Sequence, residues 1–475
     1  MKKIIFLGLL LAFSVAVFAN GGYSIKIKLN GYTEKQLFLG YHFGDKQYLR
    51  DTAEVNAQGF FVFEGAEPLP GGVYLVVMPP DNQYFQILIS ENEQNFTITA
   101  NPKEPVKGTK IEGSPDNKLL YEYLNYLTDK RPLADTMRAQ LERLKDNPKE
   151  VERITKELEK LNDQVLAYQK DLVAKHPKTL TAAIVKANLP LDIPEYTGTD
   201  EEQQLQKWRY SLQHFFDNID MADPRMLRTP FLFERITYYM EKLNVQHPDS
   251  LSKAADFILE KVQPNEETFK YYLIDFLNTY AKSNIVGMDA VYVHLVDKYY
   301  ASGKAPWTDS TQLKSIVENA NELRPTLIGK QAPNIQLEGR DGKKFNIADV
   351  QADYTILFFW AYDCGFCKKA TPVMKEFYDK FKDKGVKIIA VCRKSGAAVP
   401  ECWKYADENG TSDWIHAVDP YNNAKVYYVK TTPQIFILDK NKEIISKRIA
   451  PEQLEEVMNR IIEMKQKGSE KKAKD

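Results

Sequence analysis

The chain has 475 residues, of which 43% are hydrophobic and 27% are charged, so it is long enough to form several globular domains with buried cores. Its 64 basic and 65 acidic residues nearly cancel. This balance argues against the strongly basic surface by which proteins bind nucleic acid, and we expect no nucleic-acid partner.

The first 19 residues have the pattern of a cleaved secretory signal peptide. Lys2 and Lys3 precede an apolar run from Ile4 to Val17. Val17-Phe18-Ala19 then places small residues at the positions that signal peptidase recognises. The alternative, an uncleaved membrane anchor, is disfavoured because the run is shorter than the roughly 20 residues of a membrane-spanning helix. We therefore expect a mature protein in the periplasm or cell envelope.

Residues 21–112 are expected to form an antiparallel β-sandwich. Ile25, Ile27 and Leu29 alternate with polar residues, as in a strand with one buried face. Further short apolar runs follow about every 10–15 residues, separated by Gly, Pro, Asn and Asp, which is typical of sandwiches and barrels.

Residues 113–326 are expected to form an all-α domain. Ser114-Pro115 and Asn147-Pro148 each combine a capping side chain with a proline at the first helical position. Apolar residues then recur at three- and four-residue spacing up to the helix-ending pair His176-Pro177. The Lys/Glu-rich opposite face indicates a solvated helical hairpin, with a dimerising coiled coil, and hence a homodimer, as the alternative.

Residues 327–465 alternate between strand and helix patterns, which predicts a compact α/β domain. The last ten residues, 466–475, are rich in lysine and are expected to be a disordered basic tail. The whole chain is thus predicted to be a multidomain α+β protein with a sandwich, a helical domain and an α/β domain.

All four cysteines lie in this last domain, at positions 364, 367, 392 and 402. A secreted chain stabilised by disulfides would distribute its cysteines more widely, so this clustering indicates chemistry. A zinc site is disfavoured because Cys392 and Cys402 do not form a second Cys-x-x-Cys pair and the six histidines are scattered. A c-type haem site would need histidine where Lys368 stands, and we expect neither a metal nor a cofactor.

Cys364 and Cys367 follow an apolar strand pattern, Tyr354–Trp360, and open a helix pattern. A cysteine at a helix amino terminus is favoured as the thiolate, which makes Cys364 the expected nucleophile. Cys367 lies one turn later and can attack a mixed disulfide to release the product. An inert structural disulfide between Cys364 and Cys367 is the alternative.

The residues of this region resemble the thioredoxin superfamily, in particular secreted proteins of the TlpA/ResA type. The resemblance rests on Phe359-Trp360-Ala361, Cys364-Gly365-Phe366-Cys367, Pro372 in the following helix, and Thr431-Thr432-Pro433 before a strand. It covers residues 328–464 and implies a redox-active Cys364–Cys367 disulfide, a cis peptide bond before Pro433, and substrate-backbone binding by Thr432 and Pro433. The arrangement of all three domains also resembles secreted multidomain proteins of Bacteroidetes.

The motif departs from the family pattern in several places. Asp363 stands where the family usually has tryptophan, and Gly-Phe separates the cysteines where Gly-Pro or Glu-Pro is commoner. The two acids that assist catalysis in the family would fall at Phe358 and Ala370. Asp363 should disfavour the Cys364 thiolate, an effect that Lys368 and Lys369 oppose.

Cys392 ends the next strand and Cys402 begins the following helix, on the same side of the domain as the motif. We expect two free thiols there, with a second disulfide or a relay as the alternative.

These features predict a periplasmic thiol–disulfide oxidoreductase that reduces or isomerises protein disulfides. Its expected partners are disulfide-bearing or unfolded secreted proteins and a membrane electron donor. The alternative is a cell-envelope binding protein with a redox-inactive thioredoxin-like domain, which the loss of both acids favours. A thiol peroxidase is disfavoured because such enzymes need a threonine shortly before a lone peroxidatic cysteine, and Ala361-Tyr362-Asp363 offers no hydroxyl at that position.

Overall fold

A computed structural model describes residues 21–472 of the chain and the side chains of residues 21–466. The predicted signal peptide, residues 1–19, lies outside the described residues. By contacts the structure divides into two compact units. The first extends to Leu243 and includes Glu260–Phe269, whereas the second comprises Asn244–Leu259 and the chain from Lys270 onward. The division therefore falls inside the helical region, where the sequence analysis placed a single domain.

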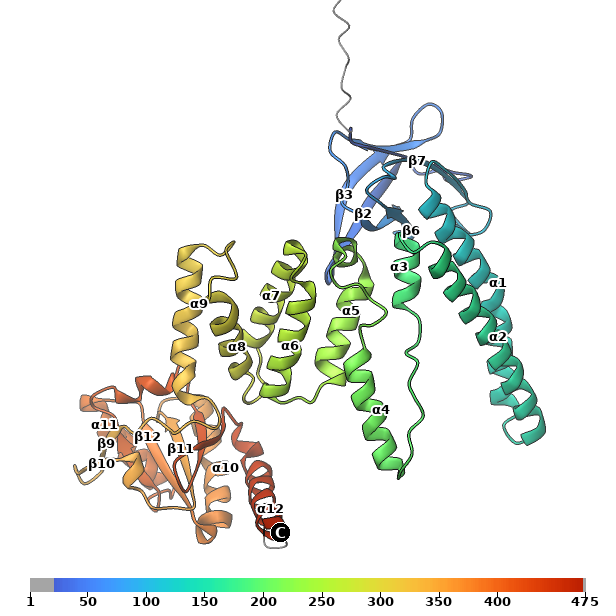
Figure 1. Cartoon of the computed structure of the whole chain (residues 1–475). Helices are drawn as coiled ribbons and strands as arrows, with labels where there is room; N and C mark the ends of the chain where they lie inside the picture. The colour runs from blue at the N-terminus through green and yellow to red at the C-terminus, as the bar shows by residue number, and fades with distance from the viewer. Residues whose placement is uncertain (1–20, 473–475) are drawn as a thin grey trace, which may run out of the picture. The chain divides into compact units, whose positions relative to one another are not determined.

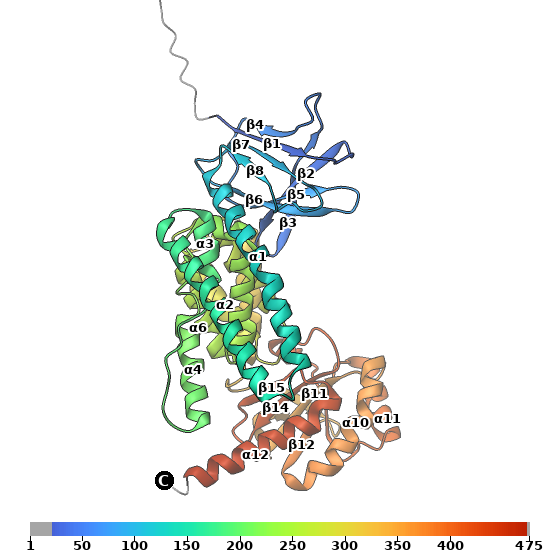
Figure 2. The ribbon, with the colours of Figure 1, turned by 90° about the vertical axis from the view of Figure 1, so that its right-hand side faces the viewer.

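The first unit begins with two four-stranded sheets, in the orders β4-β1-β7-β8 and β3-β2-β5-β6 (Figure 2). The strands are β1 Tyr23–Leu29, β2 Gln36–Phe43, β3 Lys46–Glu54, β4 Phe61–Gly65, β5 Gly72–Met78, β6 Gln83–Ile89, β7 Asn95–Ala100 and β8 Lys110–Glu112. One pairing differs from the predicted antiparallel arrangement, because β1 and β7 run parallel. These two strands are separated in the chain by five others, so no hairpin turn forces them to run in opposite directions.

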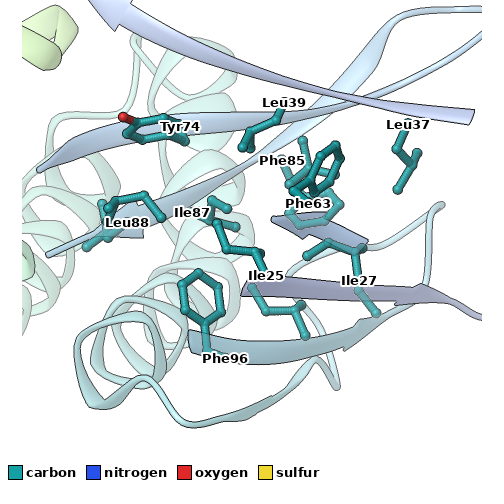
Figure 3. Close-up of a cluster of buried hydrophobic side chains, with 14 of the residues drawn as sticks. Ile25, Ile27, Leu37, Leu39, Phe63, Tyr74, Phe85, Ile87, Leu88 and Phe96 are labelled. Atoms are coloured by element: carbon teal, nitrogen blue, oxygen red, sulfur yellow. The ribbon is translucent and has the colours of Figure 1, made fainter. Parts of the chain in front are cut away.

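The two sheets enclose an apolar core. Ile25 and Ile27 are fully buried in one apolar cluster (Figure 3). The cluster also holds Phe63 of the neighbouring strand β4 and Phe85 of the facing sheet. The alternation seen in the sequence of β1 thus places every second side chain in this core, as the two-residue period of a strand requires.

The helices of the first unit follow the sandwich (Figure 1). They are α1 Pro115–Arg143, α2 Pro148–Lys175, α3 Leu180–Ala187, α4 Asp200–His214 and α5 Pro230–Tyr238. Both predicted starts are confirmed, since Ser114 accepts a hydrogen bond from the backbone N–H of Asn117 and Asn147 accepts one from that of Glu150. None of the helices within residues 21–472 combines the length and the apolar character that a membrane crossing needs.

The second unit is built on a seven-stranded mixed sheet in the order β10-β9-β13-β12-β11-β14-β15. Its strands are β9 Gln336–Gly339, β10 Lys344–Asn346, β11 Tyr354–Trp360, β12 Val386–Cys392, β13 Ile415–Val418, β14 Gln434–Asp439 and β15 Ile444–Lys447. The helices are α6 Pro248–Val262 and α7 Glu266–Ala281, which the unit boundary crosses, and α8 Asp289–Leu295, α9 Ser310–Leu323, α10 Gly365–Phe381, α11 Val399–Glu408 and α12 Leu454–Lys472.

Strand β11 lies near the middle of this sheet and is buried on both faces. Ile356, Phe358 and Trp360 pack on one side with residues of α10 and α12, and Leu357 and Phe359 pack on the other. This explains its continuous run of apolar residues, because a strand covered on both faces has no polar side.

Helix α12 continues to Lys472, seven residues into the segment predicted to be a disordered tail. Lys, Gln and Glu have high helix propensity, so this polar sequence can extend a helix that the preceding apolar residues anchor. Residues 473–475 of the predicted tail lie outside the described residues.

A buried ion pair joins α8 to β15 within the second unit. Lys447 Nζ lies 2.5 Å from Asp289 Oδ2 and donates a second hydrogen bond of 2.5 Å to the carbonyl oxygen of Thr326. The Lys447 side chain is only 2% exposed and that of Asp289 only 8%. Burial lowers the pKa of Lys447, and Asp289 opposes that shift.

We predict that Lys447→Met destabilises the protein by about 3–5 kcal/mol, because it leaves the Asp289 carboxylate buried without a partner. Urea-induced unfolding measures the change in the free energy of unfolding. Lys380→Met is the matched control, since it breaks the exposed Lys380–Glu455 pair and should cost less than about 1 kcal/mol. Equal effects of the two substitutions would contradict this prediction.

Candidate active site

The Cys-x-x-Cys motif sits where β11 ends and α10 begins. Cys364 is the residue before the first turn of α10, and its Sγ accepts a hydrogen bond of 3.3 Å from the backbone N–H of Cys367. Cys364 is partly exposed, whereas Cys367 is fully buried. The first cysteine is therefore accessible to a large substrate and the second is not.

The loop before β14 brings the Thr432–Pro433 pair to the motif. Because β14 runs antiparallel to β11, with Gln434 opposite Phe359, the residues that precede β14 lie beside the end of β11. The Thr432–Pro433 peptide bond is cis, and the Cys364 thiol lies 3.3 Å from the carbonyl oxygen of Thr432. The cis bond expected from the resemblance is thus present, and the structure places Thr432 in contact with Cys364.

The two thiols have opposite acidities. Burial works against the Cys364 thiolate, but interactions with Cys367, with Thr432 and with the backbone N–H groups of Cys367 and Phe366 outweigh it, so the pKa of Cys364 is lowered. Burial, reinforced by the neighbouring Cys364, raises the pKa of Cys367 to about 11. Cys364 is therefore suited to attack and Cys367 to remain protonated until a disulfide forms beside it.

The carboxylate next to the motif is neutralised. Lys394 Nζ lies 2.7 Å from Asp363 Oδ2, and this hydrogen bond lowers the pKa of Asp363. The sequence analysis assigned the opposing charge to Lys368 and Lys369 and missed Lys394. A signal was present, because Lys394 follows β12, which runs parallel to β11, so both strands end at the same edge of the sheet.

The positions at which the family carries acids hold apolar side chains. Phe358 and Ala370 are 1% and 2% exposed, so both positions are buried and neither offers a carboxylate. The main influences on the Cys367 thiol among the described residues come from burial, Cys364, the backbone of Ala361 and Thr432. No carboxylate is among these influences.

Cys392 and Cys402 form a disulfide in the structure. The expectation of two free thiols is therefore wrong. Cys392 ends β12 and Cys402 lies in the first turn of α11, and both are fully buried on the same side of the sheet. Their Cα atoms are 6.4 Å apart, within the usual range for a disulfide, and this packing of α11 against the end of β12 could not be read from their spacing in the sequence.

Phe366, between the two cysteines of the motif, is 74% exposed. An apolar ring held in solvent beside a reactive thiol is suited to contact an apolar part of a substrate. In contrast, the described residues include no group of three or more His, Cys, Asp or Glu side chains arranged to hold a metal ion.

Three family profiles match successive parts of the chain. Residues 23–120 match a domain of unknown function (DUF4369), residues 150–323 match a second (DUF5106), and residues 328–447 match the AhpC/TSA family. The part of the chain that carries the cysteines is thus the part for which a characterised family is found.

Curated relatives identify the domain more closely. The thiol-disulfide oxidoreductase ResA of Bacillus thuringiensis is 34% identical over 139 residues, which are 28% of this chain and 78% of the relative. The ResA protein of Bacillus anthracis is 31% identical over 138 residues, with the same shares of the two chains. The chain belongs to the ResA-type thiol-disulfide oxidoreductases. It is an enzyme with a thioredoxin-like domain, as the sequence predicted.

Solved structures include similar proteins from Bacteroides. A thioredoxin-like protein from Bacteroides caccae is 16% identical, with a TM-score of 0.43 and coverage of 57% of this chain and 98% of that chain. The thioredoxin domain of a thiol-disulfide oxidoreductase from Bacteroides vulgatus is 23% identical, with a TM-score of 0.26 and coverage of 28% and 96%.

We predict that Lys394→Met raises the pKa of Cys364, because the Asp363 carboxylate then acts on the thiolate without a neutralising partner. Only the thiolate is alkylated, so the midpoint of the iodoacetamide reaction rate at Cys364 against pH should move to higher pH. Lys394→Arg keeps the charge and should leave the midpoint in place. Asp363→Asn combined with Lys394→Met should restore it, and an unchanged midpoint in the single Met variant would refute the prediction.

Proposed function

We propose that the protein reduces or isomerises disulfide bonds of secreted proteins in the periplasm, using Cys364 and Cys367. The observation that carries the proposal is the asymmetry of the two thiols. A partly exposed sulfur of lowered pKa contacts the cis-proline loop, and a buried thiol of raised pKa lies one helical turn behind it.

The reaction begins when the Cys364 thiolate attacks one sulfur of a client disulfide. A bond forms between Cys364 and that sulfur, and the second client sulfur leaves as a thiolate that takes up a proton. Cys367 then loses its proton and attacks Cys364 Sγ, which forms the Cys364–Cys367 disulfide and releases the first client sulfur as a thiol. Two electrons pass from the protein to the client, and an external dithiol, which we assign to a membrane electron donor, must return them.

Thr432 and Pro433 are proposed to bind the client backbone beside Cys364. The carbonyl oxygen of Thr432 already lies within 3.3 Å of the sulfur, so a peptide running along this loop would present its disulfide to the nucleophile. Phe366, two residues after Cys364 in the chain, offers the client an exposed apolar contact.

The step in which Cys367 attacks the mixed disulfide favours isomerisation of the client over its reduction. Cys367 must be deprotonated before it can attack, yet its pKa of about 11 and the apolar residues at 358 and 370 leave it protonated at neutral pH. A mixed disulfide therefore lives longer than in relatives with an acid beside this cysteine, and the client has time to rearrange its own disulfides before release.

The periplasmic location rests on the leader-like first 19 residues and on the Cys392–Cys402 disulfide, since stable disulfides are typical of oxidising compartments. The loss of both acids also favours a second candidate, a cell-envelope binding protein whose cysteine pair does not turn over.

Insulin reduction with a dithiol reductant tests the proposal on the chain without residues 1–19. We expect turnover by the wild type, none by Cys364→Ala, and accumulation of a mixed disulfide with Cys367→Ala because the resolving thiol is missing. Equilibration in graded thiol buffers should give a reversible midpoint between about −270 and −120 mV for the pair. Absence of turnover with a pair that stays oxidised below about −300 mV would support the binding protein instead.

We predict that Ala370→Glu speeds resolution of the mixed disulfide. Position 370 lies three residues after Cys367 on the same face of α10, so a carboxylate there can accept the Cys367 proton. Single-turnover decay of a Cys364–peptide mixed disulfide should accelerate about tenfold or more at neutral pH. The gain should grow as pH rises through the pKa of the glutamate, which burial raises.

Ala370→Gln is the matched control, because it has the same shape without a titrating group. Equal rates for the Glu and Gln variants would show that proton transfer from Cys367 does not limit resolution.

A further inference from the structure

A hollow of about 490 Å³ opens directly beside the cis-proline loop. Its lining includes Lys430, Thr431, Pro433, Arg448 and Tyr428. Thr431 and Pro433 flank Thr432, whose carbonyl oxygen contacts Cys364, so the hollow lies along the loop that meets the nucleophilic sulfur.

A second hollow, of about 700 Å³, adjoins the first. The two share Tyr428 and Lys430, and the second adds Arg393, Lys425 and residues at the end of α9. Together they form a continuous depression, which we call the basic cleft and define by Arg393, Lys425, Tyr428, Lys430, Pro433 and Arg448.

The basic cleft carries an excess of positive charge. Arg393, Lys425, Lys430 and Arg448 line it, and Glu322 is the one acidic side chain among the lining residues of both hollows. None of these four cations lies in an ion pair with a carboxylate of residues 21–466, whereas Lys394, the neighbour of Arg393, is paired with Asp363. The cleft therefore holds cations that are available to a ligand.

The backbone around the cleft adopts a conformation that side chains rarely tolerate. Five non-glycine residues of the described chain have a positive φ, and three of them, Asn422, Tyr428 and Arg448, line the two hollows. Such conformations are energetically unfavourable and cluster at functional sites. A tyrosine with φ of 50° is especially unusual, because its bulky side chain disfavours the left-handed region.

Helix α9 supplies one wall and holds the strained tyrosine in place. Tyr428 donates a hydrogen bond of 2.9 Å from its hydroxyl to Asn319 Oδ1 on α9, and Asn321, Glu322 and Pro325 at the end of that helix line the second hollow. The ammonium group of Lys430 in turn lies 4.1 Å from the centre of the Tyr428 ring, which keeps the charge over the cleft.

We infer that the basic cleft binds the polypeptide segment flanking the client's disulfide and selects segments rich in aspartate and glutamate. This inference rests on the proposed function, because it supplies the substrate class of the same site. The cleft leads away from Cys364 over two adjoining hollows, so it can hold several residues of an extended chain while one cysteine of that chain reaches the sulfur. Attraction between its unpaired cations and client carboxylates raises the rate of encounter and weakens as salt is added.

The test measures how fast the reduced protein cleaves three synthetic disulfide peptides that differ only in their flanking residues, which are acidic, neutral or basic. We expect the acidic peptide to react about tenfold faster than the basic one at low ionic strength, and the difference to shrink at high salt. Lys430→Glu combined with Arg448→Glu should abolish or reverse this preference.

Lys387→Glu combined with Lys440→Glu is the matched control. These exposed lysines lie at the opposite ends of β12 and β14 from the active site, so the same change of net charge should leave the preference intact. Lys430→Gln combined with Arg448→Gln guards against misfolding by charge reversal and should reduce the preference without reversing it. Circular dichroism checks that each variant is folded.

Three outcomes would overturn the inference. Equal rates for all three peptides at low salt would show that the cleft does not select clients by charge. A preference that survives both cleft variants would show the same. Either result leaves the proposed function intact. The small dianionic disulfide of mercaptoacetate provides a further comparison. If the same cleft substitutions slow its cleavage as much as they slow cleavage of the acidic peptide, the cleft recognises small anions rather than a polypeptide. If the wild type cleaves none of the peptides, the proposed function itself fails.

Discussion

The hydrogen bond from the backbone N–H of Cys367 to the sulfur of Cys364 is the interaction around which the active site is organised. It places the sulfur at the amino end of α10, where unpaired N–H groups and the helix dipole favour negative charge. The residue that donates this bond is itself the second cysteine. The buried strand β11 sets the position of this helix start, and the antiparallel neighbour β14 delivers the cis-proline loop to it.

The surroundings of the two cysteines differ in charge. Lys394, at the end of β12, neutralises the carboxylate that would otherwise raise the pKa of Cys364. Nothing comparable serves Cys367, whose surroundings are apolar on every side that the family would use for an acid. The site therefore combines a first cysteine of lowered pKa with a second cysteine of raised pKa, and the proposed slow resolution of the mixed disulfide rests on this difference.

Local sequence was sufficient to predict several helix starts and the elements that carry the chemistry. The capping residues Ser114 and Asn147, the continuous apolar run of β11 and the cysteine at the start of α10 each depend on neighbours within a few residues, so their roles could be predicted. The parallel pairing of β1 with β7, the Cys392–Cys402 disulfide and the Lys394–Asp363 pair could not, because each depends on how distant segments pack. The cleft is a further case, since its charge comes from four separate loops and strand ends, and its strained tyrosine is held by a residue 109 positions away.

The buried Lys447–Asp289 pair has a consequence for the modularity of the chain. Similarity to ResA covers only 28% of this protein, which suggests an exchangeable redox domain attached to unrelated partners. Yet Lys447 on that domain is covered by α8, and one wall of the basic cleft belongs to α9. A redox domain excised at residue 327 would expose Lys447, which is buried in the intact chain, and would lose one wall of the basic cleft. Transfer of this domain alone to another scaffold would therefore carry over the two cysteines but leave behind the helix α8 that pairs with Lys447 and the helix α9 that lines the basic cleft.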